Sequence, residues 1–316
     1  MSPTRVAFLL LPQFSMLSFT TAVEPMRAAN RLAERELYAW RLYAPNAQPV
    51  SASNGLTLLP DAALEADHWA DLVFVCGGLD VHRYCDDKVL RWLNRHASRG
   101  IAVGGIAAGP YVLAQAGLLR GYRCTIHWEN LPGFAETFPG IETTDNVYEI
   151  DRTRYTCSGG TAALDMICYL ISQEHGRDLA DAVSMQFIHD RIRTPGDQQR
   201  KVRELQLMRK SPKLAGAIRV MASHVEHPLS ASEVAARVGV SVRHLERLFR
   251  KHEQHTPQRY YLILRLQHAR RLLWQTGMSM MSVALATGFS SQSHFTKCYR
   301  EQFAITPQRE RLASLG

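Results

Sequence analysis

The sequence predicts an α/β domain with a parallel sheet flanked by helices, followed by an all-α domain that contains two helix-turn-helix units. Three observations support this prediction. Apolar segments typical of buried strands alternate with helical segments as far as about residue 190. A helix pair turned at a glycine then occurs twice, and the second part of the chain holds nearly all of the excess positive charge. We therefore expect a first domain, a linker and a second domain at 1–195, 196–212 and 213–316.

The strands and helices of the first domain follow from its apolar segments. Residues 5–11 contain a continuous apolar run, as expected of a strand covered on both faces. Further strands are expected at 38–43, 72–76, 101–106, 123–126, 147–150 and 154–157. Helices are expected at 15–37, 87–97, 109–116, 161–175 and 179–191. Strands that alternate with helices in this way pair in parallel and are covered by helices.

Two strand-to-helix turns in this domain are candidate sites. Residues 104–110 have the layout of a nucleophile elbow, in which a tight turn presents one side chain above the sheet at the start of a helix. The apex residues are Ala107 and Ala108, and alanine has no lone pair to donate. The second turn, residues 157–161, has free backbone N–H groups that could hold a carboxylate. For both turns, the alternative is that small residues simply permit close packing of helix on strand.

Side chains at the ends of the expected strands are further candidates. His127, Trp128 and Glu129 follow the strand at 123–126, where open sheets bind ligands. The His–Glu pair could serve acid/base chemistry, but without Ser or Cys at the elbow we favour a hydrogen-bonding or packing role. Trp128 could form a wall for a cationic ligand, or be part of the core. We interpret Cys76 as a small buried apolar residue and not as a displaced nucleophile.

Composition and charge narrow the range of partners. Lys and Arg outnumber Asp and Glu by 20 to 8 in residues 196–316, whereas acidic residues lead by 21 to 17 in residues 1–195. Positive charge concentrated on one domain is typical of a protein with a polyanionic partner such as DNA. The six cysteines include no C-x-x-C pair, which favours a reducing cytoplasm and offers no zinc-site spacing. We expect no metal or other cofactor. The N-terminal apolar run is too short for a membrane span and lacks the flanks of a signal peptide.

The repeated unit of the second domain begins at 235–241 (Ala-Ala-Arg-Val-Gly-Val-Ser) and again at 284–290 (Ala-Leu-Ala-Thr-Gly-Phe-Ser). Each predicts a short helix, a turn through glycine, a serine that caps the next helix, and a second amphipathic helix. The second helix of such a unit enters a major groove. A helix starting at Pro257 and stopping before Gly277 joins the units, and its roughly 19 residues span about 28 Å.

The length of this connecting helix is informative because one turn of duplex DNA is about 34 Å. A rigid spacer of this size could place two recognition helices in successive major grooves on one face of DNA. The alternative is a small helical domain that binds protein, and two copies joined by a matched rod favour DNA. We expect base contacts from the exposed positions of the second helices, namely Arg243, Glu246, Arg247, Gln292, Ser293, His294 and Lys297. Any one of them could contact phosphate instead, and Leu245, Leu248, Phe249, Phe295 and Tyr299 are the expected core.

Residues about 213–316 resemble the AraC/XylS class of bacterial transcription regulators. The run A-x-x-x-G-F-S-S-Q-S-H-F from Ala284 and the terminal Thr306-Pro307 carry this resemblance. One position departs from the family pattern, because the tyrosine usually found three residues after that proline is Glu310 here. This departure affects a packing detail and not the assignment.

Residues about 5–190 resemble the class I glutamine-amidotransferase-like fold shared with PfpI-type proteases. The matching features are Glu24-Pro25, Cys76-Gly77-Gly78, the elbow around Ala107, and Thr125 to Trp128. The enzymes of this fold carry a cysteine where Ala107 stands. The resemblance therefore implies an enzyme fold kept as a sensor. It also implies an effector site formed by Phe14, Glu24, Ala107, Ala108, His127 and Trp128.

The two resemblances together imply a one-component transcription regulator without enzymatic activity. The corresponding subgroup of AraC-type regulators has effectors that include arginine and quaternary amines such as betaine and carnitine derivatives. We expect a cytoplasmic homodimer that binds double-stranded DNA, works with RNA polymerase, and activates catabolic genes when a small nitrogenous effector is bound. Two alternatives remain: a cysteine hydrolase or amidase with a DNA-binding appendage, using Cys76 or Cys157, and a repressor or architectural protein with no ligand.

Overall fold

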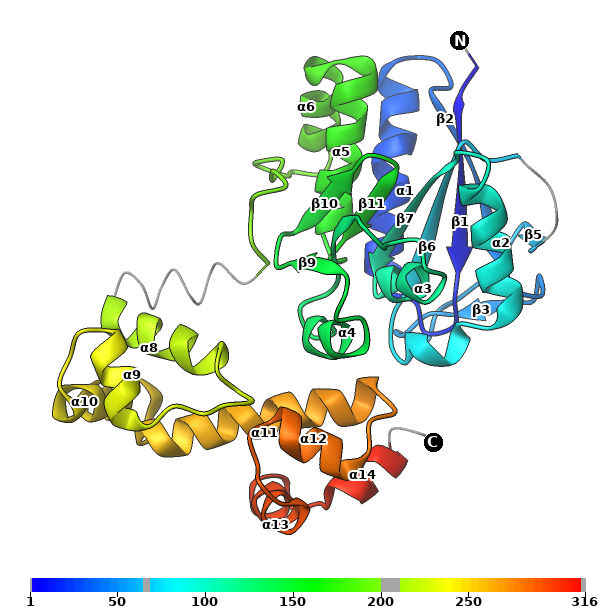
Figure 1. The fold of residues 1–316 in the computed structure, drawn as a ribbon. Helices are drawn as coiled ribbons and strands as arrows, with labels where there is room; N and C mark the ends of the chain where they lie inside the picture. Colours follow the sequence, from blue (N-terminus) through cyan, green and yellow to red (C-terminus); the bar gives the residue numbers. More distant parts are fainter. Residues whose placement is uncertain (1, 65–68, 200–210, 314–316) are drawn as a thin grey trace. The chain divides into compact units, whose positions relative to one another are not determined.

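Figure 1 shows the fold as a computed structural model, which describes residues 2–64, 69–199 and 211–313. The chain divides into two compact units, residues 1–199 and 200–316. Each unit has apolar cores of its own. Within the described ranges, no helix combines the length and the apolar character needed to cross a membrane.

The expected linker only partly matches this division. Residues 196–199, which we placed in the linker, are hydrogen-bonded to the first unit. The Val147 amide donates to the Asp197 carbonyl at 2.7 Å, and the Gln199 amide donates to the Asp145 carbonyl at 2.9 Å. Residues 200–210 of the expected linker lie outside the described residues.

The first unit is built on a seven-stranded sheet in the order β10-β11-β7-β6-β1-β2-β5. Its strands are β1 (Thr4–Leu10), β2 (Tyr38–Ala44), β5 (Ala62–Ala63), β6 (Leu72–Gly77), β7 (Ala102–Ala107), β10 (Tyr148–Asp151) and β11 (Arg154–Cys157). Neighbouring strands pair in parallel except β10 and β11, an antiparallel pair at one edge. The predicted α/β class with a largely parallel sheet is confirmed.

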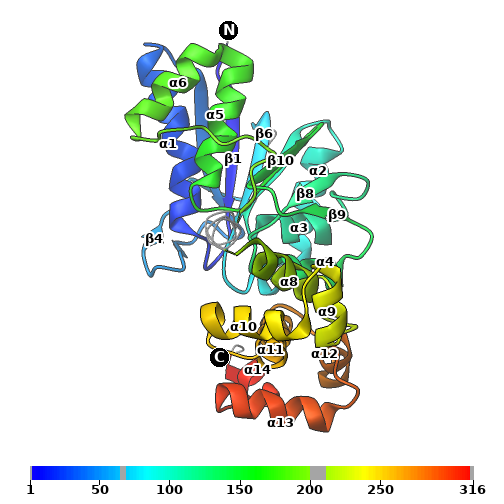
Figure 2. The same ribbon diagram turned by 90° about the vertical axis from the view of Figure 1, so that its left-hand side faces the viewer.

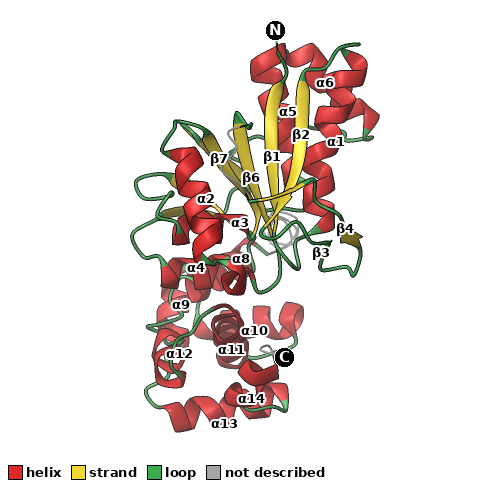
Figure 3. Ribbon diagram, turned by 90° about the vertical axis from the view of Figure 1, so that its right-hand side faces the viewer, coloured by secondary structure: helices red, strands yellow, loops and turns green. Residues whose placement is uncertain are grey.

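Helices cover both faces of this sheet (Figures 2 and 3). One face packs against α1 (Met16–Leu32), α5 (Ala162–His175) and α6 (Arg177–Gln186), and the other against α2 (Asp87–Ala97) and α3 (Gly109–Gln115). Alternate strand residues feed the two cores, so that Phe74 faces the first group of helices and Val75 faces the second. The sheet is thereby buried on both sides, which explains the continuous apolar runs in its sequence.

Several local expectations differ from the structure. The helix expected at 15–37 ends at Leu32, because the Asn30 side-chain oxygen accepts from the amides of Leu37 and Tyr38 and turns the chain into β2. The strand expected at 123–126 does not join the main sheet. It forms β8 (Arg123–Thr125), which pairs with β9 (Glu142–Thr144) in a separate two-stranded sheet. The sequence also did not predict η1 (Val81–Tyr84), α4 (Leu131–Thr137), β3 (Val50–Ser51) and β4 (Thr57–Leu58).

The second unit is all-α, as predicted. Its described helices are α8 (Pro212–Ala222), α9 (Ala231–Arg237), α10 (Val242–Glu253), α11 (Pro257–Gln275), α12 (Met280–Ala286), α13 (Gln292–Phe303) and α14 (Pro307–Ala313). One core joins α8, α9 and α10, and a second joins α11, α12 and α13. The 19-residue α11 contributes Tyr261 to the first core and Leu272 to the second, so it is packed into both halves.

Glu310, the departure from the AraC/XylS pattern, occupies a buried position in α14. The residue is 6% exposed. Its Oε1 accepts hydrogen bonds from Arg270 Nη2 at 2.8 Å and Nε at 3.0 Å. The arginine of α11 thus compensates a carboxylate where the family usually has a tyrosine, and an ion pair ties α14 to α11.

Candidate DNA-binding surface and ligand site

The second helix of each repeated unit, α10 or α13, starts at a serine cap. Ser241 Oγ accepts from the His244 amide at 3.2 Å, and Ser291 Oγ accepts from the His294 amide at 3.3 Å. The second cap is therefore Ser291, one residue later than the Ser290 that the repeat alignment suggested. Both caps satisfy a backbone N–H group that the helix itself leaves free. They fix the ends of the helices that we expect to enter the DNA grooves.

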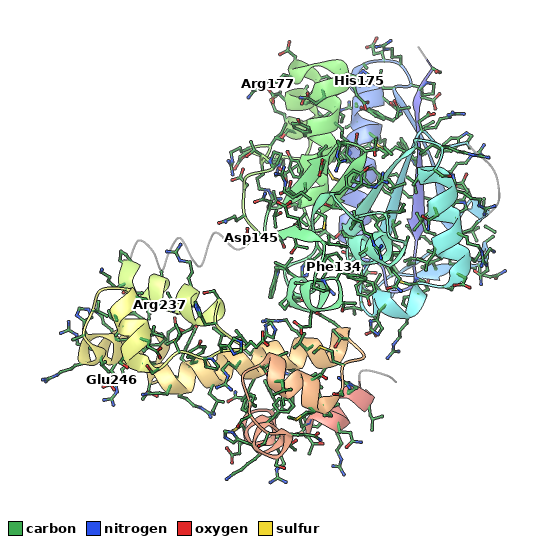
Figure 4. All side chains as sticks on the ribbon, viewed as in Figure 1. Phe134, Asp145, His175, Arg177, Arg237 and Glu246 are labelled. Atoms are coloured by element: carbon green, nitrogen blue, oxygen red, sulfur yellow. The ribbon has the colours of Figure 1, made fainter. Side chains whose placement is uncertain are left out.

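These two helices bury one face and expose the other. Leu245, Phe249, Phe295 and Tyr299 are completely buried, as predicted, and Leu248 is partly buried. The expected base-contacting residues lie on the other side: Glu246, labelled in Figure 4, is partly exposed, and the exposed members are Arg243, Arg247, Gln292, Ser293, His294 and Lys297. The structure thus brings three of the seven residues together on α10 and four on α13. Their contacts with DNA remain a prediction.

Each turn passes through a glycine in the left-handed region, with φ of +65° at Gly239 and +75° at Gly288. Gly288 is also packed tightly. A Cβ atom there would lie 2.5 Å from Pro228 Cγ and 2.6 Å from the Val225 carbonyl oxygen. The turn of the second helix-turn-helix unit therefore requires glycine both for its backbone conformation and for space.

Two side chains of α11 contact the two helix-turn-helix halves of the second domain, and neither was predicted from the sequence. Tyr261 donates its hydroxyl to the His224 carbonyl at 2.6 Å. Arg265 donates to the carbonyls of Thr287 at 2.8 Å and Gly288 at 2.7 Å, and its guanidinium lies 4.3 Å from the centre of the Phe289 ring. Burial lowers the pKa of Arg265 below its usual value, although an arginine stays charged. One helix is thus bonded both to the segment before α9 in the first half and to the turn at Gly288 in the second.

In the first unit, the predicted elbow is present. Ala107 ends β7 with φ of +59°, a strained conformation for a residue with a Cβ atom, and α3 begins at Gly109. The second predicted turn lies against it, because a Cβ atom on Gly159 would be 2.6 Å from Ala107 Cβ. The elbow geometry is retained around a methyl group that cannot act as a nucleophile.

Ser18 of α1 joins these two turns and was not predicted. It is 1% exposed. Its Oγ accepts from the Gly160 amide at 2.7 Å and donates to Ser15 Oγ at 2.8 Å. A Cβ atom on Gly159 would lie 2.8 Å from this oxygen, which places Ser18 beside the elbow. The only sequence signal was a polar residue on the apolar side of the expected helix.

The six predicted ligand residues occupy different environments. Phe14, Ala107 and Ala108 are buried, with exposures of 0%, 6% and 2%. His127 is partly exposed next to Trp128, and its amide donates to the Ala107 carbonyl at 3.1 Å, which ties this segment to the elbow. Glu24 forms an ion pair with Arg27 at 2.7 Å on an exposed part of α1. Ser18 of α1 lies against the elbow turn, and the role of Glu24 toward an effector stays a prediction.

The cysteines are poorly suited to nucleophilic chemistry. Cys76 and Cys157, the residues of the hydrolase alternative, are 1% and 0% exposed. Burial raises the pKa of the Cys157 thiol to about 11 and that of the Cys76 thiol well above its usual value. A thiol becomes a strong nucleophile only as the thiolate, which such burial disfavours. Within the described part of the chain, no cluster of His, Cys, Asp and Glu has the arrangement of a metal site.

Comparisons with known proteins agree with both parts of this geometry. Residues 234–312 match the Helix-turn-helix domain family, and residues 4–173 match the DJ-1/PfpI family. The HTH-type transcriptional regulator GbdR of Pseudomonas aeruginosa is 44% identical over 310 residues, covering 98% of this chain and 84% of the relative. A crystal structure of an AraC family transcriptional regulator from Pseudomonas putida has a TM-score of 0.55 and 31% identity, covering 58% of this chain and 100% of that one.

An enzyme is also among the relatives. An isonitrile hydratase of Pseudomonas putida is 30% identical over 187 residues, covering 58% of this chain and 77% of the enzyme. The regulator GbdR, in contrast, matches along nearly the whole chain. Regulators of the AraC type bind DNA and small-molecule effectors. Both expected resemblances are confirmed, and this chain belongs to the AraC-type helix-turn-helix transcriptional regulators with an N-terminal DJ-1/PfpI-family domain.

Proposed function

We propose that this regulator is a cytoplasmic homodimer that activates catabolic genes when a small nitrogenous effector binds its first unit. One observation carries the DNA-binding part of the proposal. The helix α11 is hydrogen-bonded to the turn of the second helix-turn-helix unit and to the carbonyl of His224 in the first half, so the two recognition helices are held at a fixed spacing. A dimer of such modules would read paired half-sites. Activation then requires contact with RNA polymerase at the promoter.

The exposed faces of α10 and α13 supply the expected readout. Arg243 and Arg247 are suited to the O6 and N7 atoms of guanine, Glu246 to the N4 amine of cytosine, and Gln292 to adenine. Ser293, His294 and Lys297 complete the proposed contacts of the second helix. The surplus of Lys and Arg in residues 196–316 supplies the phosphate attraction that positions these side chains.

We propose that the first unit senses and does not catalyse. Ala107 at the elbow and the raised pKa values of Cys76 and Cys157 support this view. Near the elbow, His127 and Trp128 would contact the effector, with the Trp128 ring facing a quaternary or guanidinium nitrogen. Phe14, Ala107 and Ala108 would form the layer beneath them. Glu24 would take part only after leaving its ion pair with Arg27.

The connection from this site to the end of the first unit is short. Gln199 Nε2 donates to the Ile126 carbonyl at 2.9 Å, to Thr125 Oγ1 at 3.0 Å and to the Asn146 carbonyl at 3.0 Å. Ile126 precedes His127 directly, and the first unit ends at Gln199. An effector that favours one position of the 125–127 segment would thereby favour one position of the chain that leads to the DNA-binding unit.

The experiment that tests the proposal is selection of bound duplexes from a random pool by the full-length protein, with and without glycine betaine and L-arginine. We expect enrichment of a repeated half-site, a complex of two chains per duplex, and affinity that falls steeply with added salt. Failure to retain any duplex at low ionic strength contradicts DNA binding. Retention of a single unpaired site by one chain contradicts the dimer.

A further inference from the structure

A pocket of about 580 Å³ lies in the first unit, between helices α5 and α6 and the segment that follows them. We call residues 187–199 the strap, since they run from the end of α6 to the end of the unit. The floor of the pocket includes Tyr148, Cys168 and Ala180, which are completely buried. This volume is typical of a site for a small molecule.

The wall that the strap forms is held in place by Asp165, which is 0% exposed. Its carboxylate accepts from His189 Nε2 at 2.8 Å, from the Arg193 amide at 2.6 Å and from Arg193 Nε at 2.8 Å. Tyr148 donates its hydroxyl to the Arg193 carbonyl at 3.1 Å, and Ser184 donates to the His189 carbonyl at 2.8 Å. Charge-assisted hydrogen bonds to a buried carboxylate make this wall a defined surface.

The mouth of the pocket carries charges of both signs on both walls. Helix α6 contributes Arg177 and Asp181, and the strap contributes Asp190 and Arg191. Figure 4 labels Arg177 and His175 at the end of the first unit where α5 passes into α6. The Arg177–Asp181 pair is 3.5 Å long with side-chain exposures of 87% and 54%, so it costs little to open.

This charge pattern fits a ligand that is itself a zwitterion. A carboxylate can take two N–H donors of Arg177, and an ammonium or guanidinium group can approach Asp190. The ring of Tyr169, which is partly exposed, offers aromatic surface within the same pocket. A purely anionic or purely cationic ligand could make only one of these two contacts.

We propose that this pocket is a second small-molecule site, distinct from the elbow, which binds an amino-acid-like zwitterion and thereby restrains the strap. The inference rests on the proposed function, because the strap ends where the first unit ends. Its last part is already fixed: the Asp197 side chain accepts from Arg191 and Thr194 within the strap, and the Asp197 carbonyl accepts from the amide of Val147, which precedes β10. A ligand between α6 and residues 189–195 would add a contact across the pocket to the bonds that Asp165 makes with this part of the strap.

Calorimetric titration of the full-length protein with L-arginine and glycine betaine tests the proposal. Agmatine and choline are the matched probes, since each keeps the cation but lacks the carboxylate. We expect Arg177→Ala to weaken binding of at least one zwitterion by 10-fold or more, to about the level of its matched probe. The control is Arg91→Ala, because Arg91 and Asp87 form an exposed pair of the same spacing and the same 3.5 Å length on α2.

A second variant guards against misfolding as the cause. Gln173→Trp places bulk at an exposed lining position of the pocket, and we expect the same loss of binding with an unchanged melting temperature. Slower amide exchange in residues 189–199 on addition of the zwitterion supports the restraint of the strap. Equal binding by Arg177→Ala, Gln173→Trp and wild type overturns the site, and so does the absence of binding by either zwitterion. Duplex binding, measured separately, decides the proposed function.

Discussion

The two helix-turn-helix units share one backbone plan but differ in how their turns are packed. At Gly239, the nearest atom to an added Cβ would be the end of a flexible side chain, Lys213 Nζ at 3.4 Å. At Gly288, the corresponding neighbours are Pro228 and a backbone carbonyl at 2.6 Å or less. The repeat in the sequence therefore specifies the left-handed turn, whereas the space around it depends on neighbours outside the repeat, Lys213 of α8 for Gly239 and the segment between α8 and α9 for Gly288.

The two units also differ in the chemistry that they expose and in how α11 holds them. The first helix offers two arginines, and the second offers mainly uncharged hydrogen-bonding groups. Tyr261 contacts the first half through neutral hydrogen bonds, a short one to the His224 carbonyl and a long one of 3.4 Å from the Leu229 amide, and Arg265 contacts the second half through two charge-assisted ones. The comparison predicts that the stability of the second helix-turn-helix unit depends more strongly on its local packing. DNA binding by the first helix-turn-helix unit should depend more strongly on charge.

The largest expected effect is the difference between two glycine substitutions. Gly239→Ala imposes only the strain of the left-handed conformation, about 1–2 kcal/mol. Gly288→Ala adds the overlap with Val225 and Pro228, so we expect a total of about 2–5 kcal/mol. Hydrogen exchange of the full-length variants, read in residues 231–253 and 280–303, reports each unit. Equal costs at the two glycines would show that packing does not distinguish the turns.

Removal of the α11 contacts should give the next largest difference. Arg265→Met leaves the carbonyls of Thr287 and Gly288 without their donor, at a cost of about 1.5–3 kcal/mol, because these bonds involve a charged group. Tyr261→Phe removes a neutral hydrogen bond worth about 0.5–1.5 kcal/mol. Chemical unfolding of the full-length protein gives both values. A larger loss of stability for Tyr261→Phe than for Arg265→Met would contradict the proposal that the second helix-turn-helix unit depends more strongly on its packing.

The charge difference between the recognition helices can be measured on DNA. Arg247→Ala should cost about 1–3 kcal/mol on the selected duplex and relax the preference at one base pair. Arg250→Ala is the matched control, since Arg250 is also exposed but lies in the last turn of α10. Fluorescence anisotropy on the selected site and on single-base variants separates the two. If Arg247→Ala weakens binding equally on every sequence, Arg247 contacts the phosphate backbone.

These differences show where sequence reasoning succeeds and where it fails. Apolar periodicity and glycine punctuation predicted the central strands, the capped helices and the 19-residue α11, because these depend on local sequence. The role of Arg265 could not be predicted from the sequence, because an arginine within a polar helix usually lies in solvent. Ser18 was missed for a related reason: its partner, the Gly160 amide, is 142 residues away. Contacts between distant segments require the tertiary fold.

The expected ligand residues show the same limit. The elbow was predicted correctly in position because strand, small residues and helix follow one another in the sequence. Glu24 was chosen by its place in a family motif, and its ion pair with Arg27 could be found only in the structure. Periodicity also extended the last helix of the first unit to residue 191, whereas the chain leaves α6 at Gln186 and forms the strap. The pocket under the strap therefore had no signature in the sequence.

The smallest expected effect is a pH dependence through His268, which lies on the shared α11. Burial lowers the pKa of His268 from 6.5 to about 4. The unfolded chain therefore binds a proton below pH 6.5 that the folded protein refuses, so stability falls as the pH drops from 6.5 toward 4. At pH 5 the loss should be about 1–2 kcal/mol, and His268→Gln should remove this part of the dependence. Because α11 packs in both cores of the DNA-binding domain, amide hydrogen exchange should rise in both helix-turn-helix units of the wild type together. A rise confined to residues 280–303 would mean that the two halves open independently, and that α11 is not the rigid spacer on which paired groove reading depends.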